Sequence, residues 1–454
     1  MSHHGFDLDG ASARRVEGFE RTSVVALRSN IARHLAGLGH RGFCTRLADS
    51  QLLQWFLRVG QPGGIKTFAK STSDRFGRWL DEAVQHEFDA RLTALLTPAR
   101  GATGGQACDI GLEVPISFDD IYFDSTCLKA GIHFPIDRVL LRDATRTLMK
   151  PTLIVRRAGL RKRMPQEPLD FVRDMNTLCM KMTAKRRSRE GQKHRKAVLL
   201  EMKKLVRRVG DHAQRHLEIL LARHPETALK PGQVKQISAQ LEGVLVQLPD
   251  AINQAHERII GGRKLPNGKK ILSLYDPDVQ VLVRGKSGDE VEFGNKLWLG
   301  ETREGYIVDY QLEAEQISDA KHVLPAMVRL VDEQGLQVES VWGDRGTASE
   351  KNKIELDARG IRSGLCPRAV GELAARLEKE PGMREGLKRR ASTEARISIL
   401  SRVFIGDPTR AKGIDNRGRQ VGWAVLSHNL WVLARLQQEE VDQTKQSNPK
   451  ARAA

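Results

Sequence analysis

Two aspartates stand in similar local contexts at distant points of the chain. Asp124 and Asp344 each follow a hydrophobic run that reads as a strand, and each precedes small polar residues. Side chains at the ends of neighbouring strands converge on one sheet, and two ionised aspartates brought together repel each other. A divalent cation relieves that repulsion, and oxygen ligands suit Mg²⁺ or Mn²⁺ with open positions for water and phosphate oxygens. The two residues are therefore candidate metal ligands.

A third carboxylate comes from a late helix predicted over residues 384–402. Arg390, Glu394, Ser398 and Arg402 recur every four residues, and so form one polar stripe on such a helix. This spacing would hold Glu394 at the edge of a site, with arginines above and below it to bind phosphates.

Each of these acids also has an ordinary structural interpretation. An aspartate after a strand is most often a turn former or a helix N-cap. A glutamate between arginines is most often part of a surface ion pair. Their combination with the overall charge favours the catalytic interpretation. Glu385 is the fallback for the third acid.

The charge of the chain points to a polyanionic partner. The 454 residues carry a formal net charge of +18, with a pI of about 9.8. Nucleic acid is the first candidate, and an anionic membrane surface is a weaker one. The most basic stretch is predicted as a helix whose exposed face contacts phosphates rather than only solvent. Its candidate contacts are Lys185, Arg186, Arg187, Arg189, Lys193, Arg195 and Lys196.

Several other classes of protein find little support. The sequence has no phosphate-binding G-x-x-x-x-G-K-[ST] loop, no H-E-x-x-H motif and no G-x-S-x-G motif. The five cysteines are far apart and form no C-x-x-C pair, which argues against a zinc ribbon or a disulfide scaffold and fits a reducing cytoplasm. No run approaches the roughly 18 apolar residues that a membrane span needs.

The elements that would position the acids form a mixed α/β core. Residues 1–100 read as short helices broken by glycine, which fits a DNA-binding helix-turn-helix and an ordinary helical bundle equally well. Strand patterns follow at 114–123, with Asp124 at the end, and at 271–274, 279–283, 291–293, 297–299, 306–308, 338–342 and 361–366. A charged helical block interrupts them, and helices over 320–334, 351–359, 384–402 and 421–437 complete the core.

At this point the chain resembles a known family, the DDE transposases of bacterial insertion sequences. The segments that carry the resemblance are YFDST at 122–126, IHFPID at 132–137, SLYDPD at 273–278, EFGNKL at 292–297, GDRG at 343–346, RASTEARISILSR at 390–402 and LSHNL at 426–430. Each is short, and their shared order is more specific than any one of them. Two features depart from the family pattern. The aspartates are 220 positions apart, and Arg402 follows Glu394 by eight positions where the family usually has a basic residue about seven on.

The resemblance implies an RNase H-like mixed sheet flanked by helices. Its parts would be an N-terminal helical domain at 1–100, catalytic-core segments at 110–150 and 269–437, a basic helical insertion at 151–268 and a disordered tail at 438–454. It also implies two Mg²⁺ or Mn²⁺ ions held by Asp124, Asp344 and Glu394, with Arg345, Arg390 and Arg402 neutralising DNA phosphates.

The implied activity is cutting at the ends of the element and joining to target DNA. The expected partner is double-stranded DNA, both the terminal inverted repeats and the target, bound by a homodimer or larger assembly in the cytoplasm at the nucleoid. Two alternatives stay open. One is a non-catalytic DNA-binding protein derived from a transposase, and the other is an RNase H-like nuclease or resolvase without strand transfer.

Overall fold

The structure is a computed structural model that describes residues 12–60, 67–97, 112, 115–183, 188–283 and 291–447. The chain divides into two compact units. The first, called here the sheet unit, comprises Met1–Ala130 and Gly294–Ala454, and the second, the helical unit, comprises Gly131–Phe293. Within the described residues, no helix is long and apolar enough to cross a membrane.

A mixed α/β architecture is confirmed by the sheet. Its strands are β1 (Asp120–Lys129), β2 (Gln280–Val283), β3 (Val291–Glu301), β4 (Ile307–Leu312), β5 (Ser340–Gly343) and β6 (Arg362–Leu365). They follow the order β2-β3-β1-β5-β6, and β4 pairs with β3. β1 is antiparallel to β3 and parallel to β5, and β6 is parallel to β5.

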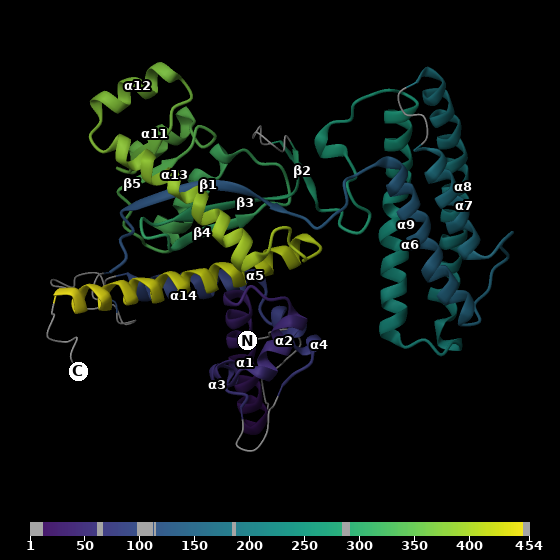
Figure 1. The fold of residues 1–454 in the computed structure, drawn as a ribbon, viewed down its shortest axis with the longest axis horizontal. Coiled ribbons are helices and arrows are strands. Elements are labelled where there is room, and N and C mark those ends of the chain that lie inside the picture. The colour runs from purple at the N-terminus through teal and green to yellow at the C-terminus, as the bar shows by residue number, and fades with distance from the viewer. Residues whose placement is uncertain are drawn as a thin grey trace. The chain divides into compact units, whose positions relative to one another are not determined.

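The alternation of side chains along β1 gives the sheet two different faces. Phe123 belongs to the apolar cluster that includes Trp298, Val341 and Leu356. Helices α10 (Val323–Met327) and α11 (Glu350–Ala358) follow β4 and β5 in the chain. The opposite face carries Tyr122 and Asp124, and α13 (Met383–Ile399) packs against it. In Figure 1, α13 crosses the ribbon of β1. The face with the aspartate is therefore the one that α13 covers.

The remaining helices of the sheet unit lie at the two ends of the chain. Those before the sheet are α1 (Ala13–Leu35), α2 (His40–Asp49), α3 (Gln51–Leu57), α4 (Lys70–Gly77) and α5 (Glu82–Leu96). Ser50 and Asp81 cap α3 and α5 by accepting backbone hydrogen bonds from the first turn. Helices α12 (Val370–Lys379) and α14 (Ile414–Ser447) come after it, and α1 and α5 both pack on α14. The N-terminal helices are thus integrated with the core, and part of their link, 61–66, lies outside the described residues.

The helical unit is built around α6 (Asp137–Arg157), α7 (Pro168–Lys181), α8 (Arg189–Arg223) and α9 (Pro231–Ile259). The four helices run side by side in Figure 1 and pack on one another around a shared apolar core. Its fully buried members include Leu148, Phe171, Met202 and Leu241.

This unit is longer than the insertion predicted at 151–268. Pro151, placed at the predicted boundary, lies inside α6. Proline in a helix removes one backbone hydrogen bond and costs roughly 3 kcal/mol. The apolar stripe nevertheless continues through Leu148, Met149 and Val155 into the bundle core. Burial of that stripe outweighs the local cost, so the helix does not end where the proline suggests.

Two other predictions about local structure were wrong, and a third placed a helix correctly but missed its change of type. The tail predicted as disordered from residue 438 is helical to Ser447, because it continues a packed helix and gains side-chain bonds such as Gln438 Nε2 to Asp442 Oδ1 at 2.9 Å. Residues 271–274 form no strand. The helix predicted over 384–402 changes at Leu400 to a π-helix that runs to Ile405. The last residues, 448–454, lie outside the described part.

Candidate active site

The two aspartates lie at the same level of two neighbouring parallel strands, Asp124 within β1 and Asp344 just after β5. Tyr122 of β1 pairs with Trp342 of β5, so Asp124 and Asp344 each stand two positions beyond a paired residue. Asp344 directly follows β5, as predicted. Asp124 was predicted to end its strand. It lies instead in the middle of β1, which continues to Lys129 by pairing with β3. That pairing partner is too remote in sequence for local patterns to reveal.

Asp124 is buried and surrounded by charges of both signs. Its side chain accepts a hydrogen bond from the backbone N–H of Ser125 at 2.8 Å, and its Oδ2 lies 2.8 Å from Nη2 of Arg390. Burial raises the pKa of Asp124 to about 6, with Arg390 opposing the rise. The carboxylates of Asp344 and Glu394 raise that pKa further. The three predicted acids therefore lie close enough to interact electrostatically.

Asp344 also has the structural role that its position suggested. Its Oδ1 accepts backbone hydrogen bonds from Gly346 at 2.8 Å and Thr347 at 3.2 Å, which makes it the turn former after β5. One carboxylate oxygen thus fixes the loop. The two interpretations of this residue are compatible, because a carboxylate has a second oxygen.

A further acidic side chain near Asp344 was missed by sequence reasoning. A Cβ placed on Gly346 would lie 3.1 Å from both Asp319 Oδ2 and Asp344 Oδ1. Asp319 is paired with Lys296 of β3, whose Nζ lies 2.8 Å from its Oδ1. Lys296 belongs to the EFGNKL segment that the sequence analysis singled out. Asp319 does not directly follow a strand, so no local pattern identified Asp319 as a candidate.

The helix α13 supplies both Glu394 and the arginine that bridges the acids. Glu394 has a side chain that is 60% exposed, and its Oε1 lies 3.6 Å from Nη1 of Arg390. The Arg390 side chain is only 14% exposed, and its guanidinium contacts both Asp124 and Glu394. Arg390 was predicted to bind DNA phosphates, whereas here it pairs with the two carboxylates of its own chain.

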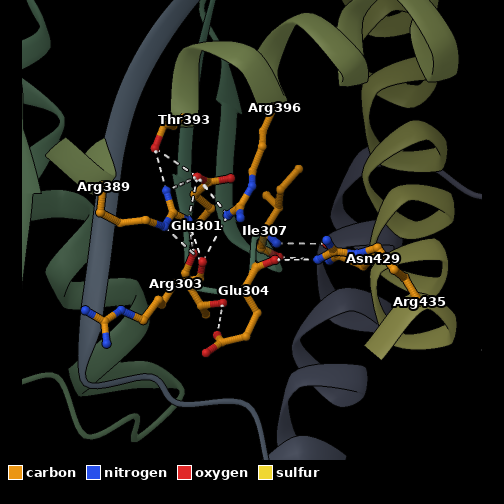
Figure 2. A network of polar contacts seen from close by, with 10 residues as sticks. Glu301, Arg303, Glu304, Ile307, Arg389, Thr393, Arg396, Asn429 and Arg435 are labelled. Carbon is orange, nitrogen blue, oxygen red and sulfur yellow. Dashed lines mark hydrogen bonds and ion pairs between the residues drawn. The ribbon is translucent and has the colours of Figure 1, made fainter. Parts of the chain in front are cut away.

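A second stripe of the same helix anchors it to the sheet, and Figure 2 shows the contacts. Oε1 of the buried Glu301, the last residue of β3, accepts hydrogen bonds from Arg389 at 3.1 Å, Thr393 at 2.8 Å and Arg396 at 3.4 Å. Arg389 also donates to the carbonyl oxygens of Thr302 and Arg303 at 2.8 and 2.7 Å. This network, called here the Glu301 anchor, fixes how α13 lies on the strands.

The other predicted site residues are less closely tied to the acids. Arg345 and Arg402 are exposed, and the π-helix that begins at Leu400 ends the four-residue period before Arg402. Glu385 lines a cavity of about 380 Å³ with Tyr122, Trp342 and Arg362. It is not among the charges that shift the pKa of Asp124, which favours Glu394 as the third acid.

The donor atoms suit a hard divalent cation, although the arginine stands between them. Asp124, Asp344 and Glu394 offer carboxylate oxygens, and the last two acids add to the rise that burial causes in the pKa of Asp124. In the described residues, no group of three or more His, Cys, Asp or Glu side chains is spaced to hold a metal ion. Arg390 lies between two of the acids, with its guanidinium in contact with Asp124 and Glu394.

The basic segment begins α8 of the helical unit. Arg189, Lys193 and Lys196 are exposed on its first turns, and Arg195 is half-buried. Lys185, Arg186 and Arg187 lie outside the described residues. Most of the net positive charge of the chain belongs to the helical unit. Residues 131–293 hold 33 Lys and Arg against 18 Asp and Glu, a net +15 of the total +18.

Comparison with known proteins gives no relative. No protein-family model matches the chain, and the searches of curated proteins and of solved structures returned no match either.

Proposed function

We propose that this protein is a DNA transposase with an RNase H-like core, which cleaves the ends of an insertion sequence and joins them to target DNA. The observation that carries the proposal is the meeting of three acids from distant parts of the chain. Asp124 of β1, Asp344 after β5 and Glu394 of α13 interact around one buried carboxylate, on strands that run parallel to each other. The order of short motifs along the sequence supports the same family.

The three acids would hold two Mg²⁺ or Mn²⁺ ions. Such ions, when bound, activate water or a DNA 3′-hydroxyl and stabilise the leaving oxygen during attack on phosphorus. The chain itself supplies the placement. The parallel register aligns the two aspartates, the Glu301 anchor holds α13 over them, and the charge of Arg390 opposes the rise that burial causes in the pKa of Asp124. Arg345 and Arg402 are exposed and would contact phosphates on either side of the reacting one.

The proposed partner is double-stranded DNA, both the terminal inverted repeats and the target. The excess charge of the helical unit supports this, because cationic side chains bind phosphates with release of counterions. Cutting two ends and joining them elsewhere requires two active sites, so a homodimer or larger assembly on DNA is expected. The site of action would be the nucleoid in the cytoplasm.

The experiment is cleavage of duplex DNA that carries the flanking inverted repeats of the gene, with Mg²⁺ present. Asp124→Asn and Asp344→Asn should each lower the cleavage rate at least about 100-fold while leaving duplex affinity within a few fold. Asp332→Asn, at an exposed residue paired with Arg359, is the matched control and should cleave normally. Unchanged cleavage in either site variant would reject the assignment.

One observation favours a second candidate, a DNA-binding protein derived from a transposase that no longer cuts. Arg390 sits between Asp124 and Glu394, where a cation would have to bind. Such a protein would bind the duplex and show no Mg²⁺-dependent nicking in the wild-type chain. A nuclease or resolvase would nick DNA but fail to join a pre-cut end to a target.

A further inference from the structure

The loop between α6 and α7 carries a second group of basic side chains in the helical unit. Arg157, Arg161, Lys162 and Arg163 are all exposed. Within the described residues, none of the four forms an ion pair with an acid. Four like charges in seven positions repel one another, and this repulsion is relieved when they face a polyanion. We call these four residues the basic loop.

The basic loop has a defined conformation, although only Arg157, the last residue of α6, lies in regular secondary structure. Leu160 is buried in the bundle core at its centre, and Gly159 supplies a positive φ of 95° just before it. Nη1 of Arg156 donates to the carbonyl oxygen of Lys162 at 2.7 Å. The backbone N–H of Lys162 lies 3.4 Å from Nε2 of His216, so the loop rests against α8.

From that contact point, basic residues continue along α8 toward its N-terminus. The exposed ones are Lys193, Lys196, Lys204, Arg207, Arg208 and Arg215. Glu201 and Asp211 are the exposed acids among them. This side of α8 is therefore a strongly positive strip, and the basic loop lies at one end of it.

The length of the strip matches the repeat of duplex DNA. Lys193 and Arg215 are 22 positions apart on one continuous helix. At a rise of 1.5 Å per residue they are separated by about 33 Å along the axis, and at 100° per residue they point within roughly 40° of each other. One turn of B-DNA measures about 34 Å. The two ends of the strip are thus one helical turn of DNA apart.

We propose that a DNA duplex lies along α8 and contacts it at two phosphate clusters one helical turn apart. The first cluster is formed by Lys193 and its neighbours, and the second by Arg215 and the basic loop. This inference rests on the proposed function for the nature of the partner, and it adds where and over what length the helical unit holds the duplex. The contacts are to backbone phosphates, so they position the DNA without reading its sequence.

The test uses the full chain with Asp124→Asn, so that DNA is bound without being cut. The loop variant is Arg161→Ala, Lys162→Ala and Arg163→Ala together. The matched control removes three exposed lysines of the same unit, Lys235→Ala, Lys264→Ala and Lys269→Ala. Affinity is measured over a series of salt concentrations for a 30-base-pair duplex and for a hairpin with a 6-base-pair stem.

The loop variant should weaken binding to the long duplex about 10-fold or more and lower the slope of log affinity against log salt by roughly 2–3. The 6-base-pair stem spans about half a turn and should lose less than about twofold. The control should change neither value by that much. Arg161→Lys with Arg163→Lys keeps the charge and should retain the affinity.

Three results would overturn the proposal. They are an equal loss with the control variant, an equal loss on both DNA lengths, and an unchanged salt slope. Binding of phosphatidylserine vesicles that the loop variant loses, with duplex affinity intact, would assign the strip to a membrane surface instead. The proposed function fails separately, through absent Mg²⁺-dependent cleavage by the wild-type chain, which these binding measurements do not involve.

Discussion

Two buried carboxylates on the same sheet are held by the same helix in different ways. Glu301 at the end of β3 accepts hydrogen bonds from three side chains of α13, two of them arginines. Asp124 in β1 pairs with a single arginine of that helix and faces two other acids. Arg389 and Arg390, the two arginines at the centre of these contacts, are neighbours in the sequence.

The difference distinguishes two parts of the site. The Glu301 anchor stabilises the fold, whereas the acids around Asp124 are available to bind a partner. The Glu301 anchor is satisfied by groups of the chain itself. Around Asp124, one guanidinium contacts two carboxylates, those of Asp124 and Glu394, and Asp344 adds a third negative charge nearby. A buried group that the fold leaves short of partners costs stability, and such groups are typical of functional sites.

The largest expected effect is on the anchor. Glu301→Gln leaves Arg389 and Arg396 without their buried counter-charge and should lower the free energy of unfolding by about 3–5 kcal/mol. Asp124→Asn removes a charge that has few partners and should change it by less than about 1 kcal/mol. Urea unfolding at pH 7.5 measures both. Equal losses in the two variants would erase the distinction between anchor and site.

A third buried carboxyl, that of Asp89, should make the stability of the fold depend on pH. Asp89 of α5 accepts a hydrogen bond from the hydroxyl of Tyr310 at 2.9 Å, and burial raises the pKa of Asp89 from 3.8 to about 7. The native state therefore keeps a proton that the unfolded chain releases near pH 4. The stability that this proton confers is complete below about pH 4 and is lost as the pH rises through 7.

The free energy of unfolding should therefore fall by on the order of 3 kcal/mol between pH 5 and pH 8. Asp89→Asn should remove this pH dependence, because the amide stays neutral. Unfolding free energies of both proteins, measured by urea at pH 5 and pH 8, test this. If the difference between the two proteins is the same at both pH values, Asp89 is ionised in the native state, and its environment is closer to that of Glu301.

The next effect concerns the single arginine of the site. Arg390→Gln removes the guanidinium from between Asp124 and Glu394, so a divalent cation no longer competes with it there. The dissociation constant for Mn²⁺ without DNA should fall roughly 5- to 10-fold, which corresponds to about 1 kcal/mol. Electron paramagnetic resonance of free Mn²⁺ measures it, with the exposed Lys388→Gln as control. Unchanged or weaker binding would show that Arg390 does not occupy the cation site.

How far the sequence predicts this arrangement depends on how local each signal is. Strand patterns placed Asp344 at the end of β5, and the four-residue spacing joined Arg390 to Glu394, because both depend on residues that are near in sequence. The Glu301 anchor joins residues about 90 positions apart, and nothing in either segment marks the partner. Arg389 and Arg396 look like exposed basic residues until β3 is placed beneath them.

The same limit explains why Asp124 was wrongly predicted to lie at the end of its strand. Polar residues after Asp124 suggested a strand end, but Ser125 and Thr126 remain in β1 because β3 pairs with them. A long antiparallel partner extends the strand through Asp124, whose residue type is depleted in strands. The strand predicted at 114–123 therefore begins and ends six residues before β1, although both span ten residues.

The smallest expected effects concern the exposed arginines outside the acidic cluster. Arg345→Ala and Arg402→Ala should each weaken duplex binding by about 0.5–1 kcal/mol and lower the salt slope by roughly 1, since each would lose one phosphate contact. Neither should alter Mn²⁺ binding, because neither contacts Asp124 or Glu394 in the described residues. If Arg402→Ala tightened Mn²⁺ binding as strongly as Arg390→Gln, Arg402 would belong to the acidic cluster despite the π-helix. The division of α13 into one arginine that serves the acids and others that serve the DNA would then be wrong.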